Sequence, residues 1–364
     1  MNAANDMRPK TDVSRTATQP PHWEQSSATE LPKATSSGRK LQVLLALWGV
    51  VLTVAVATAA TGGIGEGKHP RADVPEAFRT GPSAVGEATD APHTPLLTGI
   101  DTTSLNQQLP HSFRNVRPNT VVNAAWLRPA AMRLAAGERP LRVLHIGDSH
   151  VAGRSFPLAV KKALTASLGT AESADEGRGV WFTYVGRNGA TSATLLTDSY
   201  MNTFAEARPD LIIVSLGTNE AHGMGYREDI HSRQLDRFFA RLSEACPDAV
   251  VMLTTPPGDY LTTSYVNYRR TSRTSRRRVK VVHRTSRPNP MSARCAANII
   301  DYGAGHEMPV WDLFHIGGGD DGTSQRNWTG AHLMRPDRIH FQPAGYEVQG
   351  RLLGNAIVCA LARL

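Results

Sequence analysis

Four short polar segments hold the residue types that can do covalent chemistry. They supply Ser149 within Gly-Asp-Ser-His, Gly189 and Asn219 within glycine-containing turns, and Asp337 and His340 within Asp-x-x-His near the C-terminus. Taken singly, each segment is weak, because Gly, Asp, Ser and Asn are ordinary turn residues. All four in this order are hard to explain by turns alone. The set therefore favours a catalytic site in which a serine, a histidine and an aspartate act together.

The chemistry that these residue types allow is nucleophilic acyl transfer. A serine hydroxyl is a weak nucleophile at neutral pH and needs an imidazole within hydrogen-bond reach, and the imidazole needs a carboxylate that fixes its tautomer. Asp337 and His340 are three residues apart, so one turn or first helical turn can present both groups. The negative charge that develops needs N–H donors already in place. Glycine at 189 permits close backbone approach, and Asn219 supplies a neutral donor.

The order of the four segments resembles the SGNH/GDSL hydrolase family, whose blocks centre on a serine, a glycine, an asparagine and a histidine. The resemblance covers roughly residues 141–364. It implies that Ser149 is the nucleophile, His340 the general base and Asp337 the residue that orients the histidine. It also implies an oxyanion hole formed by the backbone N–H groups of Ser149 and Gly189 and the side-chain amide of Asn219.

Within that family, three features look like the envelope sugar O-acetylesterases, including those that act on peptidoglycan. They are the histidine after Ser149 in Gly-Asp-Ser-His, the Gly-Arg-Gly stretch at 177–179 and the Asn-Gly-Ala-Thr turn at 188–191, all followed by the late Asp-x-x-His. The resemblance implies a serine esterase that removes O-acetyl groups from a cell-envelope polysaccharide. An acyltransferase, lipase or thioesterase with the same triad is the alternative. A non-catalytic envelope-binding module is a further alternative, which the joint presence of the three triad residues disfavours.

Other polar residues near the motifs receive no catalytic assignment. Glu220 stands where the family more often has aspartate, and Asp148 is either a turn-capping carboxylate or a direct participant. His150, which replaces the leucine of the family name, is expected to be a half-exposed turn residue rather than a substrate contact. The remaining histidines and the three widely separated cysteines show no metal-ligand spacing. We therefore expect no metal and no cofactor.

The elements that must position these residues are short apolar runs separated by helical segments. Five runs are predicted to be buried strands, at 141–147, 180–186, 210–217, 249–257 and 308–314. Such alternation predicts an α/β fold with a doubly wound parallel sheet and helices on both faces. The resemblance to SGNH hydrolases implies that this sheet belongs to a three-layer, flavodoxin-like sandwich. In such sheets ligands bind beyond the carboxyl ends of the strands, which is where the polar segments fall.

The first 120 residues are predicted to lie outside the hydrolase domain. Residues 1–40 are rich in Ser, Thr and Pro and are expected to be a disordered tail. Residues 41–60 contain no charged residue and have the length of a transmembrane helix. Residues 61–120 are dense in Gly, Pro and Thr and are expected to form an extended linker. The hydrolase domain is then 121–364.

The distribution of positive charge around the predicted span sets its orientation. Lys33, Arg39 and Lys40 precede the span, whereas no Lys or Arg follows it until Lys68. This asymmetry predicts a single-pass signal anchor in the inner (cytoplasmic) membrane, with the N-terminus in the cytoplasm and the catalytic domain periplasmic or otherwise extracytoplasmic. A cleaved signal peptide is the competing interpretation, but a forty-residue leader argues against it.

The net charge of +8 comes from one segment. Between Tyr260 and Ile300 there are ten Lys and Arg residues and no Asp or Glu, so the rest of the chain sums to about −2. We expect a basic insertion over 264–290. It is either a solvated or partly disordered segment, or it contacts anionic glycan, teichoic-type polymer or lipid head groups. Nucleic acid is not an expected partner, because the predicted topology separates the domain from it.

Overall fold

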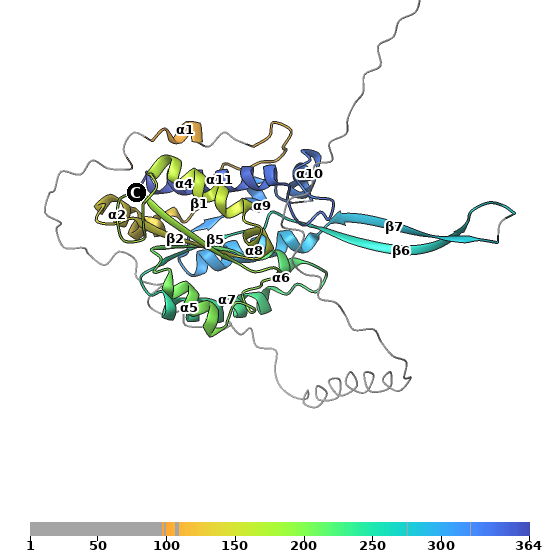
Figure 1. Ribbon diagram of the computed structural model, residues 1–364, viewed down its shortest axis with the longest axis horizontal. Coiled ribbons are helices and arrows are strands. Elements are labelled where there is room, and N and C mark those ends of the chain that lie inside the picture. The colour runs from red at the N-terminus through yellow and green to blue at the C-terminus, as the bar shows by residue number, and fades with distance from the viewer. Residues whose placement is uncertain (1–96, 98–99, 106–108, 275, 321) are drawn as a thin grey trace, which may run out of the picture. The chain divides into compact units, whose positions relative to one another are not determined.

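The computed structural model describes most of the predicted hydrolase domain and a few residues before it (Figure 1). The described residues are 97, 100–105, 109–274, 276–320 and 322–364. The predicted tail and membrane span, and most of the predicted linker, lie outside them. No helix within these described ranges has the length and apolarity needed to cross a bilayer.

A six-stranded sheet with the strand order β1-β8-β5-β4-β2-β3 forms the centre of the domain. Its strands are β1 (Val121–Val122), β2 (Leu141–Gly147), β3 (Val180–Gly186), β4 (Leu211–Ser215), β5 (Val250–Thr254) and β8 (Val310–Trp311). All neighbouring strands run parallel except the edge strand β1, which is antiparallel to β8. The five parallel strands follow the doubly wound order, with the first strand in sequence second from one edge. The prediction of an α/β fold is confirmed, and the predicted parallel sheet is confirmed except at the antiparallel edge strand β1.

Helices cover both faces of the sheet (Figure 1). One face carries α2 (Arg128–Ala136), α4 (Ser155–Leu168) and α11 (Pro343–Leu361), and the other carries α5 (Asp198–Glu206), α7 (Glu228–Ala245) and α8 (Pro290–Gly305). Shorter helical segments connect these elements, namely α1 (Thr102–Leu105), η3 (Ala124–Leu127), α3 (Ser149–Ala152), α6 (Thr218–Ala221), α9 (Leu313–Ile316) and α10 (Thr323–Gly330). Buried apolar side chains form a separate cluster on each face, so the sheet is buried on both sides.

Helices α4 and α11, which come from opposite ends of the domain sequence, pack closely against each other. Gly350 and Gly354 of α11 face α4, where a Cβ added at either glycine would lie 2.5 Å from the Cβ of Ala159 or Ala163. The small residues therefore let the two helices approach more closely than larger side chains would permit. Because α4 follows Ser149 and α11 follows the C-terminal Asp-x-x-His segment, this contact brings sequence-distant segments together.

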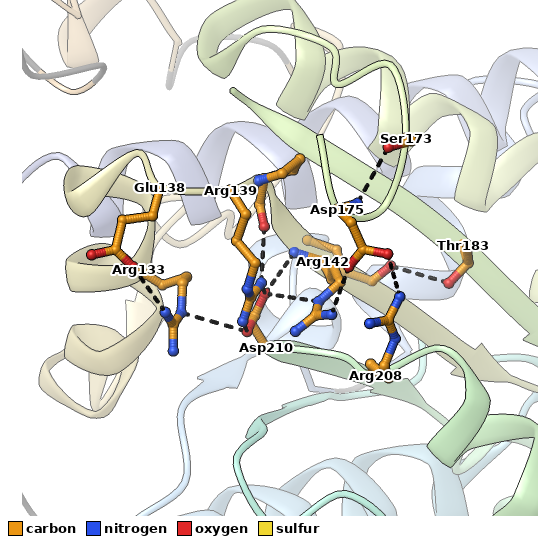
Figure 2. A network of polar contacts seen from close by, with 11 residues as sticks. Arg133, Glu138, Arg139, Arg142, Ser173, Asp175, Thr183, Arg208 and Asp210 are labelled. Atoms are coloured by element: carbon orange, nitrogen blue, oxygen red, sulfur yellow. Dashed lines mark hydrogen bonds and ion pairs between the residues drawn. The ribbon is translucent and has the colours of Figure 1, made fainter. Parts of the chain in front are cut away.

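A charge network ties the amino ends of β2 and β4 (Figure 2). The polar turns follow the carboxyl ends of these strands, so the network lies at the opposite end of the sheet. Asp210 accepts two hydrogen bonds of 2.7 Å from the guanidinium of Arg139 and one of 2.9 Å from the backbone N–H of Arg142. Partial burial raises the pKa of Asp210, but the hydrogen bonds from Arg139 and Arg142 and the positive charges of these two residues together leave the pKa below its usual value. The network therefore fixes β2 against β4.

The folded part begins before residue 121, the predicted start of the domain. Phe113 is buried, and its ring packs edge-on against that of Trp328, with centroids 4.9 Å apart. Asn119 donates to the Leu352 carbonyl at 2.8 Å and accepts from the Trp311 indole N–H at 2.9 Å. Residues 109–120 hold too few apolar residues for a periodic signal, although single side chains anchor them.

The basic segment forms a long hairpin that extends away from the sheet (Figure 1). Its strands are β6 (Tyr260–Arg270) and β7 (Arg278–Pro288), paired antiparallel along their whole length. Most of its side chains are exposed, as expected for a solvated insertion, but the described residues are regular strand. Alternating Thr, Tyr and Val residues, which favour strands, account for this order.

Candidate active site

Ser149 lies at the carboxyl end of β2, where the strand turns into the short helix α3. Asp148 is the N-cap of α3, and its carboxylate accepts a hydrogen bond of 2.8 Å from the His150 N–H. Burial raises the pKa of Asp148 to about 7. Gly147 is required at the strand end, because a Cβ there would overlap the side chain of Val151. Asp148 therefore has the turn-capping position that was one of the two expectations.

The structure brings Ser149, His340 and Asp337 into one chain of hydrogen bonds. The Nε2 atom of His340 lies 2.9 Å from the Ser149 hydroxyl oxygen, and its Nδ1 atom lies 2.9 Å from Asp337 Oδ2. Asp337 Oδ1 accepts from the backbone N–H groups of Ile339 and His340 at 3.0 and 2.9 Å. Partial burial raises the pKa of Asp337, but these hydrogen bonds outweigh it and leave the pKa lowered. The carboxylate is therefore ionised at neutral pH.

A closed turn before α11 holds the Asp337 and His340 side chains in place. Met334 and Phe341 form an antiparallel bridge at its base, and the Arg335 N–H donates to the His340 carbonyl at 2.8 Å. Arg338 adopts a left-handed conformation with φ of 57° at the tip. The two predicted residues thus come from a turn rather than from a first helical turn.

The three predicted oxyanion-hole residues line one cavity of about 510 Å³ together with His340. Gly189 has a φ of 70°, a conformation that favours glycine. Within the described ranges, the backbone N–H groups of Ser149 and Gly189 donate to no carbonyl. The Asn219 amide donates to the Ala190 carbonyl at 2.9 Å and lies 3.4 Å from Asp148 Oδ2.

Glu220 connects the two turns that carry Gly189 and Asn219. Its carboxylate accepts from the Ser192 N–H at 2.9 Å and from the Gly217 N–H at 3.0 Å. Burial raises the pKa of Glu220 to about 7. Sequence reasoning left this residue out of the site, since its partners lie in different turns. Only its departure from the family's aspartate marked it.

His150 is buried, so the expectation of a half-exposed turn residue is wrong. Its Nδ1 atom lies 3.0 Å from the Tyr346 hydroxyl, and its ring centroid is 5.4 Å from that of His340. Burial lowers its pKa to about 3. The packing of α11 over the start of α3 covers this side chain, which the turn sequence alone does not reveal.

Comparison with known proteins agrees with this geometry at the level of family and fold. The profile of the GDSL-like lipase/acylhydrolase family matches residues 145–348. A solved peptidoglycan O-acetylesterase aligns with a TM-score of 0.50 and 14% identity, covering 63% of this chain and 94% of that one. A lipase/acylhydrolase from Enterococcus faecalis aligns with a TM-score of 0.40 and 21% identity, covering 60% and 95%. No curated protein matches the sequence.

Proposed function

Because the chain belongs to the GDSL-like lipase/acylhydrolase family and is a hydrolase, we propose that it is a serine esterase that removes O-acetyl groups from a cell-envelope polysaccharide such as peptidoglycan. The observation that carries the proposal is the hydrogen-bonded chain from Ser149 through His340 to Asp337. The fold that the domain shares with a solved peptidoglycan O-acetylesterase supports the choice of substrate.

The proposed reaction passes through an acyl-enzyme. The Ser149 oxygen attacks the ester carbonyl while His340 Nε2 takes its proton, and the Asp337 carboxylate stabilises the imidazolium. N–H groups of Ser149, Gly189 and Asn219 would bind the oxyanion, each such donor being worth about 3 kcal/mol. Collapse breaks the ester bond, and His340 returns the proton to the departing sugar oxygen. Water then attacks the acyl-enzyme with His340 again as base. The bond between the acyl carbon and the Ser149 oxygen breaks, His340 returns the proton to that oxygen, and acetate leaves.

The decisive measurement is acetate release by the purified full-length chain from p-nitrophenyl acetate and from acetylated peptidoglycan. Ser149→Ala is expected to lower kcat/KM for both substrates at least about hundredfold. Ser199→Ala, on the exposed surface of α5, is the matched control and should retain the activity. Equal rates for Ser149→Ala and the parent chain would remove Ser149 from the mechanism.

The site of action is part of the same proposal. Residues 41–60 would anchor the chain in the inner membrane, with the catalytic domain on the extracytoplasmic side. Sequence alone supports this location. Protease treatment of spheroplasts should cleave the catalytic domain of the anchored chain, whereas protection until the membrane is lysed would contradict the orientation.

The β6–β7 hairpin is proposed to bind an anionic wall polymer. The support is charge complementarity, since the strands and their connection carry many Arg and Lys residues and no acidic residue. A variant with Arg269, Arg278 and Lys280 changed to Gln should bind teichoic-type polymer at least tenfold more weakly in sedimentation. Binding to a neutral glucan, compared in parallel, should not change. Equal binding of parent and variant to the anionic polymer would refute the assignment, as would preferential binding to anionic vesicles.

A further inference from the structure

A second pair of carboxylate and imidazole faces the same cavity as Ser149. The Nδ1 atom of His222 lies 2.5 Å from Asp259 Oδ2. His222 lines the cavity of about 510 Å³ that also exposes Ser149 and His340. Asp259 is nearly inaccessible, with 2% of its side chain exposed, whereas 43% of the His222 side chain is exposed. The pair therefore presents an imidazole to the cavity from a buried support.

The buried carboxylate is held from several sides. Asp259 Oδ1 accepts from the Asn289 amide and from the Ser292 hydroxyl, each at 2.8 Å. The same Asn289 nitrogen donates to the Ala221 carbonyl at 2.9 Å, immediately before His222. One cluster thus fixes both the backbone that carries His222 and the side chain that orients its ring.

This cluster is also the root of the hairpin. Asp259 and Asn289 directly flank the two hairpin strands, and the Asn289 N–H donates to the Asp259 carbonyl at 2.9 Å. On the other side of the root, the Tyr260 N–H donates to the Arg338 carbonyl at 3.0 Å, and the Arg338 guanidinium lies over the Tyr260 ring at 5.1 Å. The hairpin is therefore attached to both segments that supply imidazoles to the cavity.

The hydrogen bond from Nδ1–H to Asp259 leaves Nε2 on the exposed side of the His222 ring. In the neutral imidazole this nitrogen carries a lone pair and accepts a hydrogen bond. His222 is not the partner of the Ser149 hydroxyl, because His340 occupies that position. The cavity also lies in the volume range of small-molecule sites, so it has room for more than an acyl group.

We propose that His222 binds a hydroxyl group of the sugar that carries the ester, with Asp259 as its positioning residue. The assignment rests on the proposed esterase function and names the substrate class as an ester of a polyhydroxylated alcohol. The sugar hydroxyl donates to Nε2 while the acyl carbonyl faces Ser149. The hydrogen bond thus selects acetylated sugars over esters whose alcohol part has no hydroxyl group.

The test compares two esters with the purified full-length chain. Acetate release is measured from a monoacetylated methyl glucoside and from p-nitrophenyl acetate. The selectivity is the kcat/KM for the sugar ester divided by the kcat/KM for p-nitrophenyl acetate. His222→Gln is expected to lower this ratio about tenfold, the effect of one neutral hydrogen bond. Asp259→Asn should also lower this selectivity. His111→Gln, at an exposed position outside the cavity lining, is the matched control.

The results distinguish the proposed esterase function from the role assigned to His222. Failure of the parent chain to release acetate from the sugar ester would sink the proposed function and this assignment together. An unchanged selectivity in folded His222→Gln, with the parent active on the sugar ester, would sink the His222 assignment alone. Because His222 is half-exposed, its variant should fold even where Asp259→Asn does not.

Discussion

The histidines of the domain differ in what holds their ring nitrogens. His340 and His222 each rest on a carboxylate and face the cavity. His150 and His145 are buried and contact hydroxyl groups instead, at Tyr346 and Ser215. A carboxylate stabilises a protonated imidazole, whereas burial against neutral partners disfavours it. The two kinds of histidine are therefore suited to proton transfer or ligand binding on one hand and to packing on the other.

His145 should make the protein sensitive to acid. Burial lowers its pKa from 6.5 to about 3, so below pH 6.5 the unfolded chain binds a proton that the folded chain does not. Acid therefore lowers the free energy of unfolding through this residue until the pH approaches 3. His145→Gln should reduce the steepness of this loss by about 1.4 kcal/mol per pH unit. Denaturant unfolding between about pH 6 and pH 4 measures how steeply the free energy of unfolding falls with pH in the parent chain and in the variant. Equal slopes would contradict the role of His145.

Glu220 should affect turnover through the geometry of the two turns that it joins. Glu220→Gln keeps the length of the side chain but offers one carbonyl oxygen where the carboxylate accepts from both Ser192 and Gly217. We expect kcat to fall about tenfold with a smaller change in KM, because one turn is released from its position. Steady-state kinetics beside exposed Glu206→Gln would show this. A parent-like kcat would mean that the turns hold their positions without the bridge.

The sequence located the triad residues because they lie in compact motifs with a chemical logic of their own. Ser149, His340 and Asp337 do lie together, while their roles stay predictions until rates are measured. The His222–Asp259 pair escaped notice because its members belong to no motif. Their contact depends on the hairpin root, and spacing in the sequence cannot reveal it.

At the level of elements, the packing of α4 on α11 sets the distance between nucleophile and base. Gly350→Ala would place a Cβ 2.5 Å from that of Ala159, so α11 must shift. We expect the free energy of unfolding to fall by about 1–3 kcal/mol and kcat to fall with it. Thermal unfolding and acetate release measure the two effects. Gly305→Ala, where an added Cβ meets nothing within 4 Å, is the control; equal behaviour of the two variants would contradict the packing argument.

The five parallel strands could be predicted because each is a buried apolar run that ends in a turn. The bounds differ only at the ends, as in β8, where just Val310–Trp311 forms ladder bonds. The two-residue edge strand β1 carries too little pattern to be recognised. The residues of the two hairpin strands favour extended structure, but their many positive charges are typical of a solvated insertion. The strands were therefore not predicted.

At the level of the whole molecule, the domain depends on residues before its predicted start. Phe113→Ala removes a buried ring that packs on Trp328 and should lower the free energy of unfolding by about 3 kcal/mol. Chemical denaturation of the full-length chain measures this change. Val116→Ala, at a position with 45% exposure, is the control and should have little effect. A Phe113→Ala chain as stable as the parent would mean that residues 109–120 merely lie on the surface.

The attachment of the hairpin at the cavity determines where a polymer bound to the hairpin meets the active site. Each strand has eleven residues, which corresponds to an arm about 35 Å long. Its root is bonded to both walls of the cavity, at His222 through Asp259 and beside His340 through Arg338. A polymer bound along such an arm would be held next to the cavity where the root of the hairpin meets it. Successive esters along the polymer would then reach Ser149 one after another. The hairpin would therefore align the polymer with the site as well as hold it.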